Sequence, residues 1–229
     1  MKNLSIFGKI ARVGLAPFGL NMSPIISLIF INRFSMAYGG ETAVACYACI
    51  AYMLTILYYL IQGVGDGSQP LMSQYYGEGN WASVKRIRCY AYVLSEILTL
   101  AGAAILFCGR AHIGVVFGAS PQVSAQVAEA IPIFLIGVIF LSFARIITSG
   151  FYATANGFFS YILVYAEPVL LIGLLLILPR FGGQTAVWWS MTGAQLMTCG
   201  IAFLLKQYAD KQNARKFHCV PQKVCKTVE

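Results

Sequence analysis

Charged residues are the scarcest class in this 229-residue sequence. They make up 10% of it, while 59% of the residues are apolar. Soluble domains are about 45–50% apolar and about one quarter charged. A soluble core could not hide this much apolar surface, whereas a lipid bilayer can. The composition therefore excludes an ordinary soluble domain and predicts an integral membrane protein.

Motifs for catalysis and for metal binding are also lacking. The sequence contains no H-E-x-x-H, no G-x-S-x-G and no Walker motif, so it suggests neither hydrolysis nor use of ATP. It has two histidines, His112 and His218. Most of its seven cysteines lie in apolar segments, and we interpret Cys46 and Cys49 as helix-packing residues. The sequence therefore predicts no enzyme, no metal site and no cofactor.

Long apolar segments are what the sequence does contain. A membrane-spanning helix needs about 20 mainly apolar residues. Six segments meet this requirement: 10–34, 42–64, 90–108, 131–155, 160–179 and 184–205. The first is too long for the apolar part of a cleaved signal peptide and has no A-x-A site, so we expect it to remain as a span. None alternates with period two, which favours an all-α protein of six transmembrane helices over a membrane β-barrel.

The basic residues indicate the orientation of these spans. With the N-terminus inside, twelve Lys and Arg residues fall on the inner side and three on the outer side. The outer three are Arg33, Arg110 and Arg180. The positive-inside rule then places both termini, the 78–88 loop and a basic tail at 209–229 in the cytoplasm. Residues 109–130 would face outside, with Ser120-Pro121 starting a short helix over 121–130.

The stretch GVGDGSQPLMSQYYGEGN at 63–80 is polar and rich in glycine, and it follows a long apolar segment. Its glycines have G-x-G-x-G spacing after a membrane helix, which does not match a nucleotide site. We interpret it as the end of a helix at the inner face, with a kink at Pro70. Gly63 and Gly67 would let another helix approach. Asp66 and Gln69 would then face a bundle interior or a cavity.

Residues 63–88 contain QPL, YYG, GN and a basic cluster, and in this order they resemble the multidrug and toxic compound extrusion (MATE) transporters. GFYATANGFFSYILVYAEPV at 150–169 and ILPRFGGQTAVWWSMTGAQLMT at 177–198 are similar to later segments of the same family. The resemblance covers residues 8–207. One departure is Ala186, where the family often has glycine, and this concerns local packing.

The resemblance implies one six-helix lobe, residues 1–208, similar to the second of the two lobes in the family. It implies cation-coupled antiport of organic cations or drugs at the plasma membrane, with Na⁺ or H⁺ as the coupling ion. Transport sites of this kind lie between two repeats. The resemblance therefore also implies a second six-helix lobe as partner, either a separate chain or another copy of this one. Residues of a first lobe, including its acidic cation site, have no counterpart in this sequence.

Four ionisable residues, Asp66, Glu96, Arg145 and Glu167, lie within or near the spans. Glu96 is expected to snorkel or to pair with Arg88. Arg145 and Glu167 lie on antiparallel helices at depths that differ by about 6 Å, so their long side chains could form a structural ion pair. Alternatively Glu167, followed by Pro168, could bind a coupling cation or proton. Both readings of Glu167 stay open.

The candidate site residues follow from these arguments. Glu167 and Asp66 are candidates for cation coupling, and Gln69, Tyr75, Arg145 and Tyr165 are candidates for a substrate cavity. The many tyrosines could line a site for flat organic cations or form aromatic belts at the interfaces, where Trp188 and Trp189 are expected. Two other functions remain open: a flippase for a lipid-linked precursor in the same superfamily, and a non-transporting or accessory membrane protein.

Overall fold

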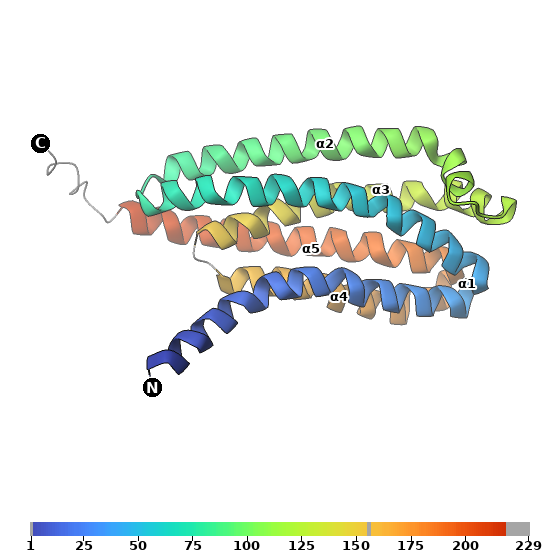
Figure 1. The fold of residues 1–229 in the computed structure, drawn as a ribbon, viewed down its shortest axis with the longest axis horizontal. Helices are drawn as coiled ribbons and strands as arrows, with labels where there is room; N and C mark the ends of the chain where they lie inside the picture. Colours follow the sequence, from blue (N-terminus) through green and yellow to red (C-terminus); the bar gives the residue numbers. More distant parts are fainter. Residues whose placement is uncertain (1, 155–156, 219–229) are drawn as a thin grey trace, which may run out of the picture.

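The computed structural model describes residues 2–154 and 157–218, and within them the chain forms five α-helices. These are α1 (Lys2–Gly77), α2 (Trp81–Val116), α3 (Pro121–Ala153), α4 (Gly157–Ile177) and α5 (Pro179–His218). All run along the same long axis (Figure 1). The all-α prediction is confirmed, because every element of the described residues is helical.

Two of the helices change direction at a glycine. Gly40 in α1 has φ 67° and ψ −163°, and Gly183 in α5 has φ 55° and ψ −139°. Positive φ with ψ near 180° is a region that essentially only glycine enters. At Gly40 the two segments of α1 turn back on one another, so that they run in opposite directions (Figure 1). Residues 10–34 and 42–64, which were expected to form two spans, lie in α1 on either side of this turn.

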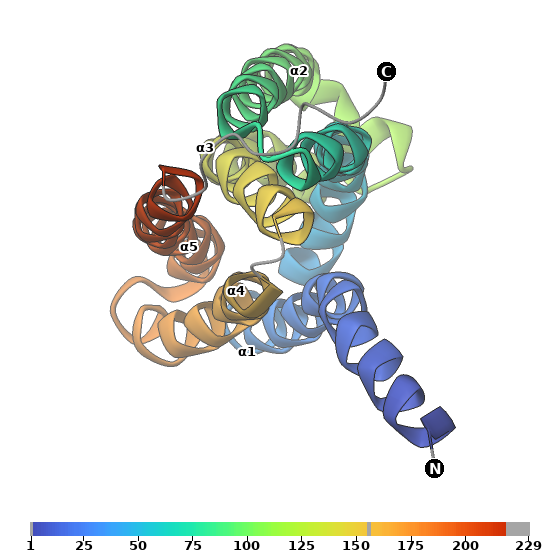
Figure 2. The same ribbon diagram turned by 90° about the vertical axis from the view of Figure 1, so that its left-hand side faces the viewer.

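Helix α3 lies at the centre of the bundle. It contacts each of the other four helices, and Figure 2 shows them arranged around it. Its residues Ile131, Phe134 and Val138 are all at most 1% exposed and belong to the largest apolar cluster. The beginning of α1 and the end of α5 lie at the same end of the molecule (Figure 1). The elements that hold the site are thus α3 and the helices packed on it.

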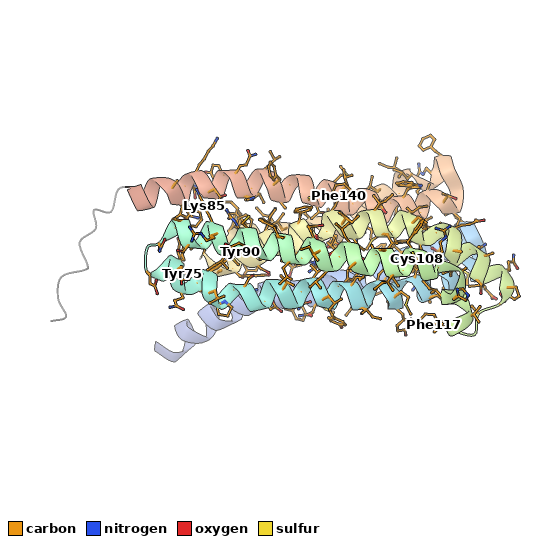
Figure 3. All side chains as sticks on the ribbon, turned by 90° about the horizontal axis from the view of Figure 1, so that it is seen from above. Tyr75, Lys85, Tyr90, Cys108, Phe117 and Phe140 are labelled. Carbon is orange, nitrogen blue, oxygen red and sulfur yellow. The ribbon has the colours of Figure 1, made fainter. Side chains whose placement is uncertain are left out.

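The surface of the bundle is apolar along most of its length. Among the described residues, α2, α3, α4 and the Asn21–Gly77 part of α1 are long and apolar enough to cross a membrane. Helix α5, which holds the expected span 184–205, is not one of these four. Large apolar side chains such as Ile105, Leu204 and Phe158 are 72%, 67% and 72% exposed. A membrane protein places such side chains against lipid. Figure 3 shows side chains projecting outward along the length of the bundle.

The helix starts follow local signals in the sequence. Ser120 caps α3 by accepting a hydrogen bond from the Val123 N–H at 3.4 Å, and Pro121 is the first helical residue, as predicted. The expected short helix 121–130 is not separate, because α3 continues through Pro132 to Ala153. In the same way α1 stays helical through Pro70 to Gly77, and Asn80 caps α2 by accepting from the Ser83 N–H at 3.1 Å.

Glycine packing and the tail differ from the expectation. A Cβ added at Gly63 or Gly67 would meet nothing within 4 Å, so no other helix in the described residues approaches them closely. The close approach is at Gly65, where an added Cβ would lie 2.5 Å from Ser149 Oγ. Helix α5 runs on to His218, so the first half of the predicted tail 209–229 is helical. Residues 219–229 lie outside the described part.

Candidate functional site

The centre of the site is an ion pair between α3 and α4. The Arg145 Nη2 and Glu167 Oε2 atoms are 3.7 Å apart, and the two side chains are 19% and 10% exposed. The two helices are antiparallel and joined near residue 156, so residues at similar distances from the link lie at similar depths. The predicted pairing of these residues is confirmed.

A cavity of about 170 Å³ lies against this pair. Arg145 and Glu167 are its charged lining residues, and the aromatic rings of Tyr47, Tyr58 and Phe134 line it too. Met191 of α5 lines it as well. The remaining lining residues come from α1 and are Pro24, Ile25, Ser27, Leu28, Ala51, Leu54 and Thr55. Four helices, α1, α3, α4 and α5, therefore contribute to its wall. An apolar cavity with a few converging polar groups is the usual form of a small-molecule site.

A second, much smaller cavity of about 10 Å³ also borders the pair, and it has room for about one water. Ser23 from α1, Thr148 from α3 and Thr198 from α5 line it together with Arg145 and Glu167. Ser23 and Thr198 are each 3% exposed, and their hydroxyl oxygens have no hydrogen-bond partner among the described residues. Most buried polar groups are paired, so unpaired hydroxyls beside a charged pair indicate that something else engages them.

The other candidate residues lie elsewhere and line neither cavity. Asp66 is exposed and accepts a hydrogen bond from Gln69 Nε2 at 3.1 Å. Tyr75 packs against a small cluster around Trp81 at the α1–α2 turn. Tyr165 is 39% exposed and lies over Gly19, where an added Cβ would be 2.6 Å from its hydroxyl oxygen. The structure thus brings together two of the six candidates, Arg145 and Glu167.

Comparison with known proteins places this arrangement in a family. The family model MatE matches residues 15–176, which is more than half of the chain. The chain belongs to the MatE family. The family consists of transporters, so the prediction that the protein is not an enzyme is confirmed.

The MatE chain is similar to the multidrug export protein MepA of Staphylococcus haemolyticus (strain JCSC1435), with 20% identity over 197 residues. The match covers 86% of this chain and 43% of MepA. This chain also superimposes on an outward-facing multidrug resistance MATE family transporter, with a TM-score of 0.85 and 20% identity. The superposition covers 92% of this chain and 48% of the transporter. For an inward-facing structure the TM-score is 0.84, with 19% identity and coverage of 92% and 49%. The chain spans about half the length of these relatives.

Of the two expectations for Glu96, snorkelling or pairing with Arg88, the pairing was wrong. Arg88 does not pair with Glu96 in this MatE chain but forms two hydrogen bonds to Asp210 of α5, at 2.9 and 2.6 Å. Glu96 instead accepts a hydrogen bond from Ser142 of α3. Residues 88 and 96 are eight apart, which turns them about 80° from one another around α2. The two side chains therefore face different helices.

The Arg88–Asp210 pair links α2 to α5. It lies at the end of the bundle where α1 begins and α5 finishes. The Arg88 guanidinium is also 5.8 Å from the centre of the Trp81 ring, within the range of a cation–π contact. Lys206 of α5 is close enough for its charge to interact with both partners. Burial, and after it the charge of Arg88, lowers the pKa of Lys206, while Asp210 acts in the opposite direction. This cluster joins helices that otherwise contact little.

The aromatic residues divide between the cavity and the surface. Tyr47 is 5% exposed and Tyr58 receives a hydrogen bond from Gln195 Nε2 at 3.2 Å, so both are held at the cavity wall. Tyr52 and Tyr59 are 68% and 69% exposed and lie on the outer surface of the bundle, away from the cavity. Of the two tryptophans expected at the outer interface, Trp189 is 44% exposed but Trp188 is 7% exposed and packs in the main core.

Proposed function

We propose that this chain forms one lobe of a secondary transporter that exchanges an organic cation or drug for Na⁺ or H⁺ by alternating access. The observation that supports it best is a buried carboxylate, Glu167, on the wall of an aromatic cavity between membrane-length helices. Ionisable residues inside a membrane usually mark a transport path or a proton relay. Membership of MatE and the likeness to multidrug transporters in two conformations support the same function.

In this proposal the chain crosses the plasma membrane six times. Helix α1 crosses twice because of its reversal at Gly40, and α5 crosses once although its polar residues lower its hydropathy. The termini and the basic residues Lys85 and Arg88 would then face the cytoplasm. Support comes from the arrangement of the ends: α1 begins and α5 finishes at the same end, and Lys85 lies at that end (Figures 1 and 3).

A second six-helix lobe completes the transporter, as a separate chain or as another copy of this one. Asp66 and Gln69 are polar, and Asp66 is exposed on α1 next to the apolar part of the helix. Polar groups at membrane depth normally face protein or water rather than lipid. A partner surface over this part of α1 would cover them and would make Asp66 the second candidate for cation coupling.

The charge of the cavity separates this proposal from a flippase for a lipid-linked diphosphate. Such a substrate needs a positively charged cavity. Of the residues that line the two cavities, Arg145 is the cation, and Glu167 lies against it. The pair has no net charge, which supports transport of an organic cation over transport of a diphosphate.

The test is efflux of a fluorescent organic cation from cells that normally carry the chain and its natural partners. Deletion of the chain should abolish gradient-driven efflux, and Glu167→Gln should do the same while the protein remains in the membrane. Glu78→Gln is the matched control, because Glu78 lies exposed at the α1–α2 turn and bonds to Gln74. Unchanged efflux after deletion, or intact efflux with Glu167→Gln, would reject the transport function or the role of Glu167 respectively.

A further inference from the structure

The Arg145–Glu167 pair borders two cavities of different character. Among the lining residues, these two are shared by the large aromatic cavity and the small cavity beside Ser23, Thr148 and Thr198. Arg145 therefore lies at the wall of an aromatic cavity and also at the wall of a cavity lined by hydroxyl groups.

The pair itself is loose. At 3.7 Å the Arg145 and Glu167 atoms are beyond normal hydrogen-bond distance. A guanidinium carries five N–H donors and usually forms two parallel bonds with a carboxylate. Arg88 does so with Asp210 in the same chain, at 2.9 and 2.6 Å. Within residues 2–154 and 157–218 the Arg145 side chain donates no hydrogen bond, so its N–H donors are available to another acceptor.

The small cavity offers acceptors for those donors. The hydroxyl oxygens of Ser23 and Thr198 are buried, and no residue in the described part of the chain forms a hydrogen bond with them. Thr148 donates its hydroxyl hydrogen to the Ala144 carbonyl at 2.8 Å, which leaves the lone pairs of its oxygen free to accept. Three hydroxyl oxygens from three helices thus converge beside a guanidinium with unused donors. Their pairing with Arg145 would remove the cost of leaving them buried and unpaired.

We propose that Arg145 is a tethered cation that occupies the cation position at Glu167. An incoming organic cation displaces it toward the hydroxyls of Ser23, Thr148 and Thr198. The inference rests on the proposed function, because it specifies how the transporter cavity admits its substrate. The aromatic faces of Tyr47 and Tyr58 add attraction for an organic cation that a small inorganic ion would not gain as fully. Competition by Arg145 would therefore select organic cations over inorganic ones.

The test is equilibrium binding of radiolabelled tetraphenylphosphonium to the full chain in lipid nanodiscs. If the displaced state of Arg145 is populated at about 1–10%, apparent affinity is reduced by that fraction. Arg145→Met should then bind the probe about 10- to 100-fold more tightly than the wild type. Glu167→Gln should lose binding in both backgrounds. Equal affinity of Arg145→Met and the wild type, or absence of binding in every variant, would overturn the inference.

The hydroxyl acceptors give a second and independent readout. Thr198→Val should weaken binding in the wild type, because the displaced guanidinium loses an acceptor, but should have no effect in the Arg145→Met background. Thr99→Val is the matched control, since Thr99 is 1% exposed on α2 and bonds to the Ser95 carbonyl. Equal weakening in both backgrounds would contradict displacement.

If Arg145→Met does not fold, the proposal is tested by binding of the same probe to the double variant Ser23→Ala, Thr198→Val, which keeps Arg145. Weaker binding than with Thr99→Val is expected, and unchanged binding overturns the proposal. Binding is measured without a gradient, so a loss of efflux and a loss of competition are separate results. Binding that follows this pattern without efflux would reject transport and leave the competition at Glu167 standing.

Discussion

Replacement of Asp210 by asparagine tests the contact that joins α2 to α5. The pair is bidentate, and its Arg88 and Asp210 side chains are 9% and 23% exposed. Removal of one partner of a fully buried pair costs about 3–5 kcal/mol, whereas exposed pairs contribute about 0–1 kcal/mol. The Arg88 charge is nearly buried and would lose its carboxylate. We therefore expect Asp210→Asn to lower the free energy of unfolding by about 2–4 kcal/mol.

The reverse change should cost less. Arg88→Met keeps an apolar chain against Trp81 and leaves Asp210 as the unpaired charge. Asp210 is the more exposed partner, and its carboxylate also interacts with the charge of Lys206. Solvent and Lys206 therefore compensate in part for the lost interaction with Arg88. We expect about 1–2 kcal/mol for this variant. The two single changes should therefore differ, and the double change should cost less than their sum.

The measurement is unfolding in mixed micelles titrated with SDS. Lys211→Met is the control, because Lys211 is the exposed charged neighbour of Asp210 on α5. It should stay within about 0.5 kcal/mol of the wild type. The reasoning would be refuted if Asp210→Asn were as stable as the wild type, or if the single costs added fully in the double variant. Either result would mean that α2 and α5 do not depend on this pair.

Two further predictions concern the backbone and the topology. Gly40→Ala should destabilise the protein by about 1–3 kcal/mol because of its positive φ, whereas Gly67→Ala, in an open helical position, should be neutral or stabilising in the same unfolding titration. A neutral Gly40→Ala would show that the reversal does not need glycine. Ser120→Cys in a cysteine-free background should be labelled from outside intact cells, and labelling that requires permeabilised cells would contradict the proposed orientation.

The ion pair between Arg145 and Glu167 was predictable because its geometry depends on few quantities. The two helices are joined by a short link, so distance from the link along the chain gives depth in the bundle. Both residues are charged and lie within apolar segments, so pairing with each other is strongly favourable. What the sequence did not contain was the rotation of each helix. The hydroxyls of Ser23 and Thr198 therefore could not be placed beside the pair in advance.

The same limit explains the residues that were expected at a cavity and lie elsewhere. Asp66 and Tyr165 have suitable chemistry, but neither residue lines either cavity. Arg88 and Asp210 are separated by 122 residues, so no local rule pairs them. Nearness along the helix favoured Glu96 as the partner of Arg88, although an interval of eight residues on one helix does not align two side chains. Long-range pairs need the packing of whole helices, which periodicity alone does not determine.

The reversals at Gly40 and Gly183 did have a signal in the sequence. The segments GGETAV, from Gly39, and GGQTAV, from Gly182, are nearly identical, and each precedes a helix that runs back along the bundle. In the structure the two turns lie together, because Gln184 Nε2 donates to Ser35 Oγ at 3.2 Å and an added Cβ on Gly39 would lie 2.8 Å from the Gln184 side chain. A repeated glycine pair between apolar segments thus indicates two equivalent reversals. Their contact fixes the first segment of α1 beside α5, which is what brings Ser23 and Thr198 to the same small cavity.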